Sequence, residues 1–506
     1  MKNQILGFFS RKRANVEGTD LFCNKVSSTF VIFKKGKHMD SFLEALSTKN
    51  ARTANGAITN STSLNKCLDF FSIAGNPREN IESFEAAFGE DPQLAMRILF
   101  WSRDCRGGAG ARRNFITIMR KLQLERPAVF SKVFRFIPEF GYWKDVYHLK
   151  PTPEVIKFIA ETLVTESDHS LCAKYCPRKG EWFYHLRKIL KMSPSEFRHF
   201  IVSKTQVVEN FMCANEWNSI KYEEVPSVAG LRYKNTFIKH DGERYNQYIQ
   251  SVLKGENKIN SSVLYPNDIY HNYIHQPQDA TSISAIRAMW DSLPNFMEGC
   301  KDRILPICDV SGSMTGTPME VSVALGCYIS ERNEGPFKDA FITFSERPEL
   351  QILSGDIISR FNQLRRADWG RNTDLQAVFD LILRRTQETH MSQELMPTKL
   401  LVISDMHFDE ACGCNYCWYK NSPEPTNFEA IKAKYAAAGY KMPGIIFWNV
   451  RGDAGNVPVT MRDQNVGLVS GYSPSILKSV LQAKVLSPIE LMLNTVNTER
   501  YSVISL

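Results

Sequence analysis

The chain has 506 residues, of which 43% are hydrophobic and 11% aromatic. It is too long for one ordinary hydrophobic core, so we expect two or three folded domains. No run of 18 apolar residues occurs, which argues against a membrane span. The N-terminal segment has a short apolar patch without a small-residue cleavage site, which argues against a secretory signal. We therefore expect a cytoplasmic protein that does not bind membranes.

The charge is unevenly distributed along the chain. Residues 1–300 carry 41 Lys and Arg against 31 Asp and Glu, whereas residues 301–506 carry 21 against 23. The first part is thus net +10 and the second net −2, so a polyanion-binding surface is expected in the first part. The alternative is a solvated basic surface without a partner. The twelve cysteines are spread thinly, and we expect most of them to be reduced.

The first part of the chain predicts an irregular arm followed by helices. Residues 1–60 lack any sustained apolar period and are interpreted as an irregular N-terminal arm. Residues 61–280 contain segments with apolar residues at spacings of three and four, namely 64–75, 82–104, 112–124, 128–140, 153–164 and 244–253. Successive amphipathic helices without strands predict stacked helix pairs, an α-solenoid of the HEAT kind.

The pattern changes in residues 281–506. The polar stretch NDIYHNYIHQPQDA looks like a domain boundary, and a helix in ISAIRAMWDSL follows it. Strands are then predicted in RILPICD, DAFITFS, PELQIL, KLLVISD, GIIFWNV and VGLVS, with helices between most of them. This alternation predicts an α/β, doubly wound, mostly parallel sheet. Ligands of such sheets bind beyond the carboxyl ends of the strands.

Polar side chains occur where the predicted parallel strands end. They are Asp309, Ser311, Ser313, Thr373 and Asp405. All five offer hard oxygen ligands, which suit Mg²⁺, Mn²⁺ or Ca²⁺. Because two of the five are charged, a bound ion would stay electron-poor and would accept a carboxylate or phosphate of a partner as a further ligand. Serines after a strand can also merely cap the next helix.

The order D-x-S-x-S, then Thr, then Asp resembles the metal-ion-dependent adhesion site (MIDAS) of von Willebrand factor A domains. All five positions match, and the order of strands and helices from about residue 300 onward agrees with that domain. The resemblance implies a von Willebrand factor A-like, Rossmann-like domain in residues 281–506. It implies a metal-dependent protein-protein interaction.

The first part carries a second resemblance. The stretches NGAITNSTSLNKCLDFF, RDCRGGAGARRNF and IPEFGYWKDVYHL resemble the DUF2828 group of proteins, found in plants, bacteria and giant viruses. That architecture is similar to the Ro autoantigen (TROVE) proteins, in which HEAT-like helices carry an A domain and bind small structured RNAs and RNA ends. The resemblance implies a TROVE-like ribonucleoprotein component. A giant-virus source would add a virion location.

Two basic clusters are candidate RNA-binding residues. Arg103, Arg106, Arg112 and Arg113 surround a Gly-rich turn that opens a helix, where backbone amides and guanidinium groups would cradle a phosphate. The alternative is a tight interhelical turn with a solvated basic face. Lys174, Arg178 and Lys179 lie beside Trp182, an arrangement found on nucleic-acid surfaces, although a solvated face is the simpler interpretation.

Two further motifs follow the predicted strands of the second part. Cys412, Cys414, Cys417 and His407 offer three thiols and an imidazole, which is a candidate zinc site. Reactive thiols and incidental cysteines are the alternatives. Residues 451–453 spell RGD and are interpreted as an ordinary polar turn, with Asp453 facing solvent.

These observations predict a non-enzymatic protein that binds RNA through its helical module and an acidic group through a metal ion in its A domain. The alternatives are a protein-interaction scaffold without RNA and a Mg²⁺-dependent hydrolase acting on nucleic acid. Haloacid-dehalogenase-like phosphatases use D-x-D, and Ser311 stands where their second Asp acts as general acid. The oligomeric state is not predicted.

Overall fold

The computed structural model describes residues 51–167, 169–261, 263–343, 348–366, 374–409, 426–482 and 487–506. The chain divides into two compact units, Met1–Glu44 and Ala45–Leu506, and every described residue belongs to the second. None of the helices in these residues is long and apolar enough to cross a bilayer.

The described chain begins with a short antiparallel hairpin of β1 (Ala51–Arg52) and β2 (Ile58–Thr59). The hairpin is tied to the last third of the chain. The Thr53 hydroxyl donates a hydrogen bond of 2.6 Å to the carbonyl of Phe408, and Asn60 pairs with Val457. Residues 1–50 of the predicted arm lie outside the described residues, and the end of the arm at residue 60 stays a prediction.

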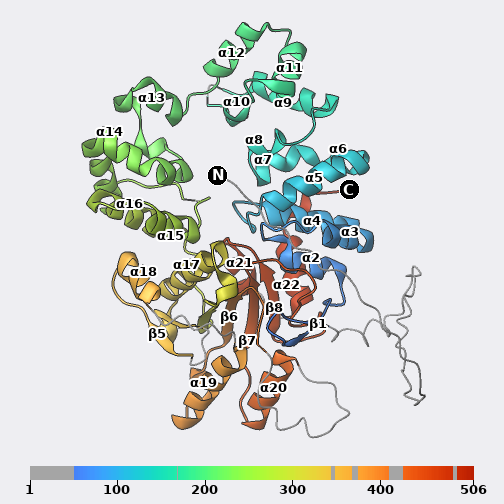
Figure 1. The fold of residues 1–506 in the computed structure, drawn as a ribbon, viewed down its shortest axis with the longest axis vertical. Coiled ribbons are helices and arrows are strands. Elements are labelled where there is room, and N and C mark those ends of the chain that lie inside the picture. The colour runs from blue at the N-terminus through green and yellow to red at the C-terminus, as the bar shows by residue number, and fades with distance from the viewer. Residues whose placement is uncertain are drawn as a thin grey trace, which may run out of the picture. The chain divides into compact units, whose positions relative to one another are not determined.

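The next part of the unit consists of helices packed in succession, as Figure 1 shows. Local signals fix their ends: Pro92 opens one helix, where Asp91 accepts a hydrogen bond from the amide of Leu94 at 2.9 Å. The helices are α2 (Lys66–Ala74), α3 (Ile81–Glu90), α4 (Pro92–Arg103), α5 (Arg113–Glu125), α6 (Pro127–Val133), α7 (Ile137–Phe140), α8 (Trp143–Val146), α9 (Pro153–Thr165), α10 (Leu171–Tyr175), α11 (Gly180–Ile189), α12 (Pro194–Ser203), α13 (Val208–Ala214), α14 (Ser227–Leu253), α15 (Pro266–His275) and α16 (Ala280–Asp291).

The polar stretch 267–280, which looks like a domain boundary in the sequence, is mostly helical. Residues Pro266–His275 form helix α15, with Ile269 and Tyr270 buried in the core. The remaining positions are mostly polar, so the apolar stripe is too narrow to give a clear helical period in the sequence. Helix α15 packs against the first helix of the following α/β region, which connects the two parts of the unit.

A six-stranded sheet forms the second part, in the order β5-β4-β3-β6-β7-β8. All neighbouring strands are parallel except β4 and β5. The strands are β3 (Ile304–Cys308), β4 (Ala340–Thr343), β5 (Leu350–Ile352), β6 (Lys399–Ser404), β7 (Gly444–Asn449) and β8 (Val466–Ser470). Every residue of the five parallel strands β3, β4, β6, β7 and β8 is buried, which explains their continuous apolar sequences.

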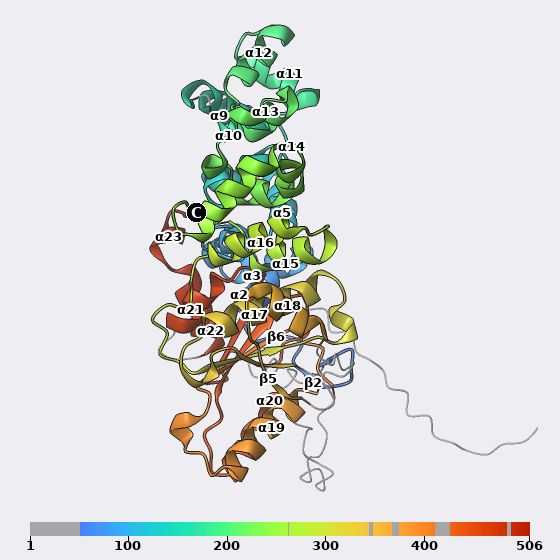
Figure 2. The ribbon, with the colours of Figure 1, turned by 90° about the vertical axis from the view of Figure 1, so that its left-hand side faces the viewer.

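Helices cover both faces of this sheet, as Figure 2 shows. Leu305 and Cys308 point to opposite faces of β3: Cys308 meets Gly326, and Leu305 faces a cavity that α19 lines. The helices are α17 (Thr317–Arg332), α18 (Ile357–Arg366), α19 (Leu375–Glu388), α20 (Asn427–Ala437), α21 (Ile476–Gln482), α22 (Pro488–Val496) and α23 (Glu499–Ser502). The predicted fold class, a helical module followed by a doubly wound α/β domain, is confirmed.

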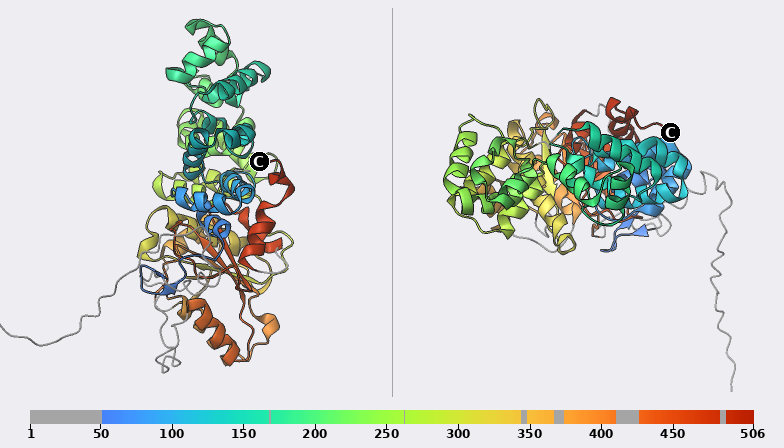
Figure 3. Two further views of the ribbon diagram at one scale, coloured as in Figure 1. Left: turned by 90° about the vertical axis from the view of Figure 1, so that its right-hand side faces the viewer. Right: turned by 90° about the horizontal axis from the view of Figure 1, so that it is seen from above.

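The first helices also pack directly on the α/β region. Helix α2 contacts β8 and α22, and α4 contacts α22 and α23, as Figure 3 shows for the blue and red segments. Gly75 at the end of α2 lies so close to β8 that an added Cβ would sit 2.2 Å from the carbonyl oxygen of Ser470. The helical module therefore joins the sheet region through α2–α4 at its beginning and through α15–α16 at its end.

Candidate functional site

Two buried carboxylates lie at one edge of the sheet. Strands β3 and β6 are parallel neighbours, and the amide of Asp309 donates a hydrogen bond of 2.9 Å to the carbonyl of Ile403. Asp309 and Asp405 follow the carboxyl ends of these two strands, and both are 0% exposed. The parallel pairing therefore brings together two acidic residues that are about a hundred residues apart in the sequence.

Hydroxyl groups surround Asp309. The Ser311 amide donates to Asp309 Oδ1 at 2.9 Å, and the Ser311 and Ser313 hydroxyl oxygens are 3.0 Å apart. The Ser404 hydroxyl, which the sequence analysis missed, donates to Asp309 Oδ2 at 2.5 Å. Four of the five predicted ligands thus belong to one region of the fold, whereas Thr373 lies outside the described residues.

The site carries excess negative charge. Burial, together with the nearby Asp405 carboxylate, raises the pKa of Asp309 to about 6. Arg451 supplies a positive charge here: its Nη1 lies 3.5 Å from Asp405 Oδ2 and also donates to the Ser313 carbonyl. This guanidinium belongs to a side chain that is 39% exposed. One half-exposed guanidinium thus stands against two buried carboxylates at this edge of the sheet.

The RGD turn does not expose its aspartate, which corrects the interpretation that Asp453 faces solvent. Its side chain is 18% exposed and pairs with Arg78, with Arg451 at 3.3 Å and with His407 Nε2 at 2.9 Å. His407 is therefore held by Asp453 in the described structure. Cys412, Cys414 and Cys417 lie outside the described residues, so the zinc site stays a prediction.

The Gly-rich turn before α5 is a packed structural element. Arg103 is 1% exposed, and its Nε and Nη2 lie 2.8 Å and 2.6 Å from Asp145 Oδ2. Arg112 Nε lies 2.6 Å from the other oxygen of the same carboxylate. A Cβ on Gly108 would sit 2.1 Å from the Trp101 carbonyl oxygen. These contacts correct the predicted role of Arg103, which is buried against Asp145, whereas a phosphate-binding role for Arg112, with 36% of its side chain exposed, stays a prediction.

The other two arginines of this turn are at the surface. Arg113 is 76% exposed in its side chain and pairs with Glu79 at 3.0 Å. Arg106 is also exposed, and its Nη1 donates to the Glu139 carbonyl at 2.8 Å. The structure therefore separates the four predicted arginines into a pair that binds Asp145 and a pair at the surface. An RNA-binding role for Arg106 and Arg113 stays a prediction.

The second predicted basic cluster, Lys174, Arg178 and Lys179, is more exposed to solvent than the first. Lys174 pairs with Glu209 at 3.1 Å, whereas Arg178 and Lys179 are exposed. Trp182 is 7% exposed, and its indole N–H donates a hydrogen bond to the Tyr147 carbonyl. This ring is therefore part of the hydrophobic core and is not a surface for bases.

A neighbouring aromatic residue occupies the surface instead. Tyr184 is 43% exposed, and Lys188 Nζ lies 4.5 Å from its ring centroid, with the Arg187 guanidinium at 5.4 Å. We call the basic residues of this segment the α11–α12 ridge: Arg178, Lys179, Arg187, Lys188, Lys191 and Arg198. Residues 178–198 contain these six cations and two Glu, a local net charge of +4. The sequence signal was the spacing of Tyr184 and Lys188 on one helical face.

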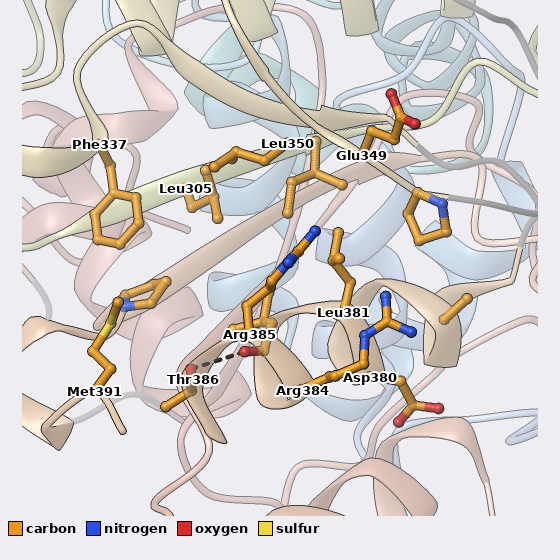
Figure 4. Close-up of a pocket in the computed structure, with 15 residues that line it drawn as sticks. Leu305, Phe337, Glu349, Leu350, Asp380, Leu381, Arg384, Arg385, Thr386 and Met391 are labelled. Carbon is orange, nitrogen blue, oxygen red and sulfur yellow. Dashed lines mark hydrogen bonds between the residues drawn. The ribbon is translucent and has the colours of Figure 1, made fainter. Parts of the chain in front are cut away.

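A cavity of about 980 Å³ lies between α19 and strands β3–β5, as Figure 4 shows. Its lining is largely apolar, with Leu305, Leu350 and Met391 on its walls and Arg384 and Arg385 from α19. The lining includes neither Asp309 nor Asp405. The cavity is therefore distinct from the carboxylate site at the strand ends.

Comparisons with known proteins agree with the division of the chain into two parts. A model of DUF2828, a domain of unknown function, matches residues 53–152 and 152–294, which confirms the resemblance to that group. A model of DUF7788, also a domain of unknown function, matches residues 303–502.

One relative and one solved structure extend over most of the chain. Uncharacterized protein L728 of Acanthamoeba polyphaga mimivirus is 28% identical over 504 residues, which cover 87% of this chain and 86% of that protein. The crystal structure of the Ro (RSR) protein of Deinococcus radiodurans is similar with a TM-score of 0.46 and 13% identity. That match covers 85% of this chain and 99% of the Ro chain.

Proposed function

We propose that the α/β region binds a divalent cation at the ends of β3 and β6 and uses it to bind an acidic group of a partner. The observation that carries this proposal is the pair of fully buried carboxylates, Asp309 and Asp405, beside the hydroxyls of Ser311 and Ser313. Burying two like charges costs free energy, which a cation between them would offset. The oxygen-only donor set fits Mg²⁺, Mn²⁺ or Ca²⁺.

The ligand set explains why such an ion would attract a partner. The serine hydroxyls are neutral donors, and Arg451 already offsets part of the charge of Asp405. A divalent ion held here would keep net positive charge and accept a carboxylate of an acidic protein or a phosphate as a further ligand. Thr373, which precedes α19 in the sequence, would complete the set according to the resemblance to the adhesion-type site.

Replacing Asp309 by Ala is expected to remove one Mg²⁺ from the full-length protein, as measured by equilibrium dialysis. Changes to residues that merely support a metal ligand weaken binding by roughly 10- to 100-fold, so the loss of a ligand should weaken it by at least as much. Mg²⁺ is the appropriate probe because it prefers oxygen ligands over imidazole and thiolate. Asp380→Ala on α19, whose side chain is 48% exposed, is the matched acidic control. Equal Mg²⁺ binding by both variants would refute the metal site.

We also propose that the helical module binds RNA through the α11–α12 ridge. The specific observation is an exposed tyrosine, Tyr184, flanked by Lys188 and Arg187 within a net-positive segment of the chain. Exposed aromatic rings stack on unpaired bases, and neighbouring cations neutralise phosphates. Figure 1 shows α11 and α12 at the top of the helical module.

Reversing three charges of the ridge, Arg187→Glu, Lys188→Glu and Lys191→Glu, is expected to weaken binding of a labelled structured RNA. The slope of log affinity against log salt should become shallower by about 2 to 3, because each lost phosphate contact removes about 0.7 to 0.9. Fluorescence anisotropy at several salt concentrations measures both quantities. The matched control carries Arg384→Glu, Arg385→Glu and Lys432→Glu, which make the same charge change at exposed positions of α19 and α20. Equal weakening in both triple variants would assign RNA attraction to net charge and not to the ridge.

We propose that the protein binds its partners without catalysing a reaction. The same assays distinguish this function from a Mg²⁺-dependent hydrolase and from a protein-interaction scaffold without RNA. RNA that stays intact during incubation with the protein and Mg²⁺ supports binding without hydrolysis, whereas cleavage that Asp309→Ala abolishes would support the hydrolase. If the wild-type protein binds no RNA at low salt, the remaining candidate function is a protein-interaction scaffold. A cytoplasmic location fits these roles and is part of the proposal.

A further inference from the structure

A cluster of metal-binding side chains lies between the helical module and the α/β region. His271 and His275 occupy one face of α15, four positions apart, and Glu320 lies in the first turn of α17. His271 Nδ1 is 2.8 Å from Glu320 Oε2, and His275 Nε2 is 2.9 Å from Glu320 Oε1. The donor atoms of the three residues all lie within 4.8 Å of one another.

The two imidazole rings are arranged for a shared ligand. Their centroids are 4.4 Å apart, and the side chains of His271 and His275 are 59% and 51% exposed. Glu320 is more enclosed, with 14% of its side chain exposed. Within the described residues, Glu320 forms ion pairs with these two histidines and with no lysine or arginine. A carboxylate that is largely enclosed and faces two imidazoles is well placed to share a cation with them.

We propose that His271, His275 and Glu320 bind a transition-metal ion of the Zn²⁺ class. Two imidazole nitrogens and one carboxylate oxygen are a common three-ligand zinc set, with a fourth position left for water or another ligand. Imidazole favours Zn²⁺ over Mg²⁺ or Ca²⁺, so this site differs in metal preference from the oxygen-only site at Asp309. The exposure of both histidines leaves the ion accessible from solvent.

The position of Glu320 gives the ion a structural consequence. Helix α17 begins at Thr317, shortly after Ser313 of the predicted adhesion-type site, and Glu320 lies in its first turn. An ion held by Glu320 and by the two histidines of α15 would therefore connect the end of the helical module to α17, the helix that follows the Asp309 loop. Zn²⁺ binding is expected to stabilise this connection, because an ion that binds the folded state alone raises its stability.

The test uses the full chain with Cys412, Cys414 and Cys417 changed to Ser, so that the predicted cysteine site does not contribute. Zn²⁺ affinity is measured by competition with a chromophoric chelator, and Co²⁺ is used as a spectroscopic probe of imidazole ligands. In this background one Zn²⁺ should bind. Its affinity should fall roughly 100-fold or more with His271→Ala plus His275→Ala, since two of three protein ligands are lost. The visible absorption of bound Co²⁺ should disappear with it.

Two further variants keep the result specific. Glu320→Gln preserves the shape of the side chain and removes its charge, so it should also weaken Zn²⁺ binding. His185→Ala plus His199→Ala removes two histidines from α11 and α12 and should leave Zn²⁺ binding unchanged. Equal Zn²⁺ affinity in the His271/His275 variant and the background would overturn the proposal. So would the absence of Zn²⁺ binding in the background, which would leave these residues as plain hydrogen-bonded ion pairs.

Discussion

Replacing Asp145 by Ala is expected to lower the free energy of unfolding by about 3–5 kcal/mol, because it leaves a buried arginine without its counter-charge. Asp145 is 1% exposed and binds Arg103, which is equally buried, and Arg112. Its Oδ2 also accepts a hydrogen bond from the Tyr142 amide at 3.1 Å at the start of α8. The carboxylate thus connects α4, the Gly-rich turn and α8. Urea unfolding followed by circular dichroism measures the change.

The same turn offers a control for this prediction. Arg113→Ala removes a guanidinium that is 76% exposed and paired with Glu79 at the surface. An exposed ion pair contributes about 0–1 kcal/mol, so this variant should unfold close to the wild type. A loss of less than about 1 kcal/mol in Asp145→Ala would mean that Arg103 finds water or another partner, and its assignment as a structural residue would then be wrong.

The contrast between the strand ends and the Gly-rich turn shows what sequence can predict. Asp309 and Asp405 follow continuous apolar strands, and parallel pairing then forces both to one edge of the sheet, so their proximity follows from the pattern alone. Arg103 and Arg113 belong to one basic motif, yet one is buried and the other exposed. That difference depends on Asp145, more than thirty residues away, which no local pattern reveals.

Long-range contacts account for the other unpredicted features. Tyr184 and not Trp182 is the exposed ring, because the indole finds a partner in the Tyr147 carbonyl. Helix α15 was not predicted as a helix because its buried stripe is narrow, and the contact of its two histidines with Glu320 on α17 could not be predicted from the sequence. Each case depends on which neighbour packs against a helix face, and that information is absent from the periodicity of the segment itself.

Changing Lys234 to Met is expected to stabilise the protein at pH 7 by about 1–3 kcal/mol. Lys234 of α14 is 0% exposed, and its Nζ donates to Gln278 Oε1 at 2.9 Å and to the Ser282 hydroxyl. Burial lowers its pKa from 10.5 to about 8, opposed by nearby Asp279. The folded state therefore carries the cost of a buried charge at neutral pH. Gln278 and Ser282 also hydrogen-bond to each other at 2.6 Å, so the variant leaves them paired.

The pH dependence follows from the direction of that shift. Between pH 8 and pH 10.5 the unfolded chain holds the Lys234 proton and the folded chain releases it, so this residue makes stability rise with pH across that window. Lys234→Met removes this contribution, and its advantage over the wild type should shrink as the pH increases from 8 to 10. Urea unfolding midpoints at pH 7, 8, 9 and 10 measure the difference. Lys239→Met, at an exposed position of the same helix, should follow the wild type within about 0.5 kcal/mol at every pH. A constant offset between Lys234→Met and the wild type would show that the lysine is charged throughout, held by Asp279 against the effect of burial.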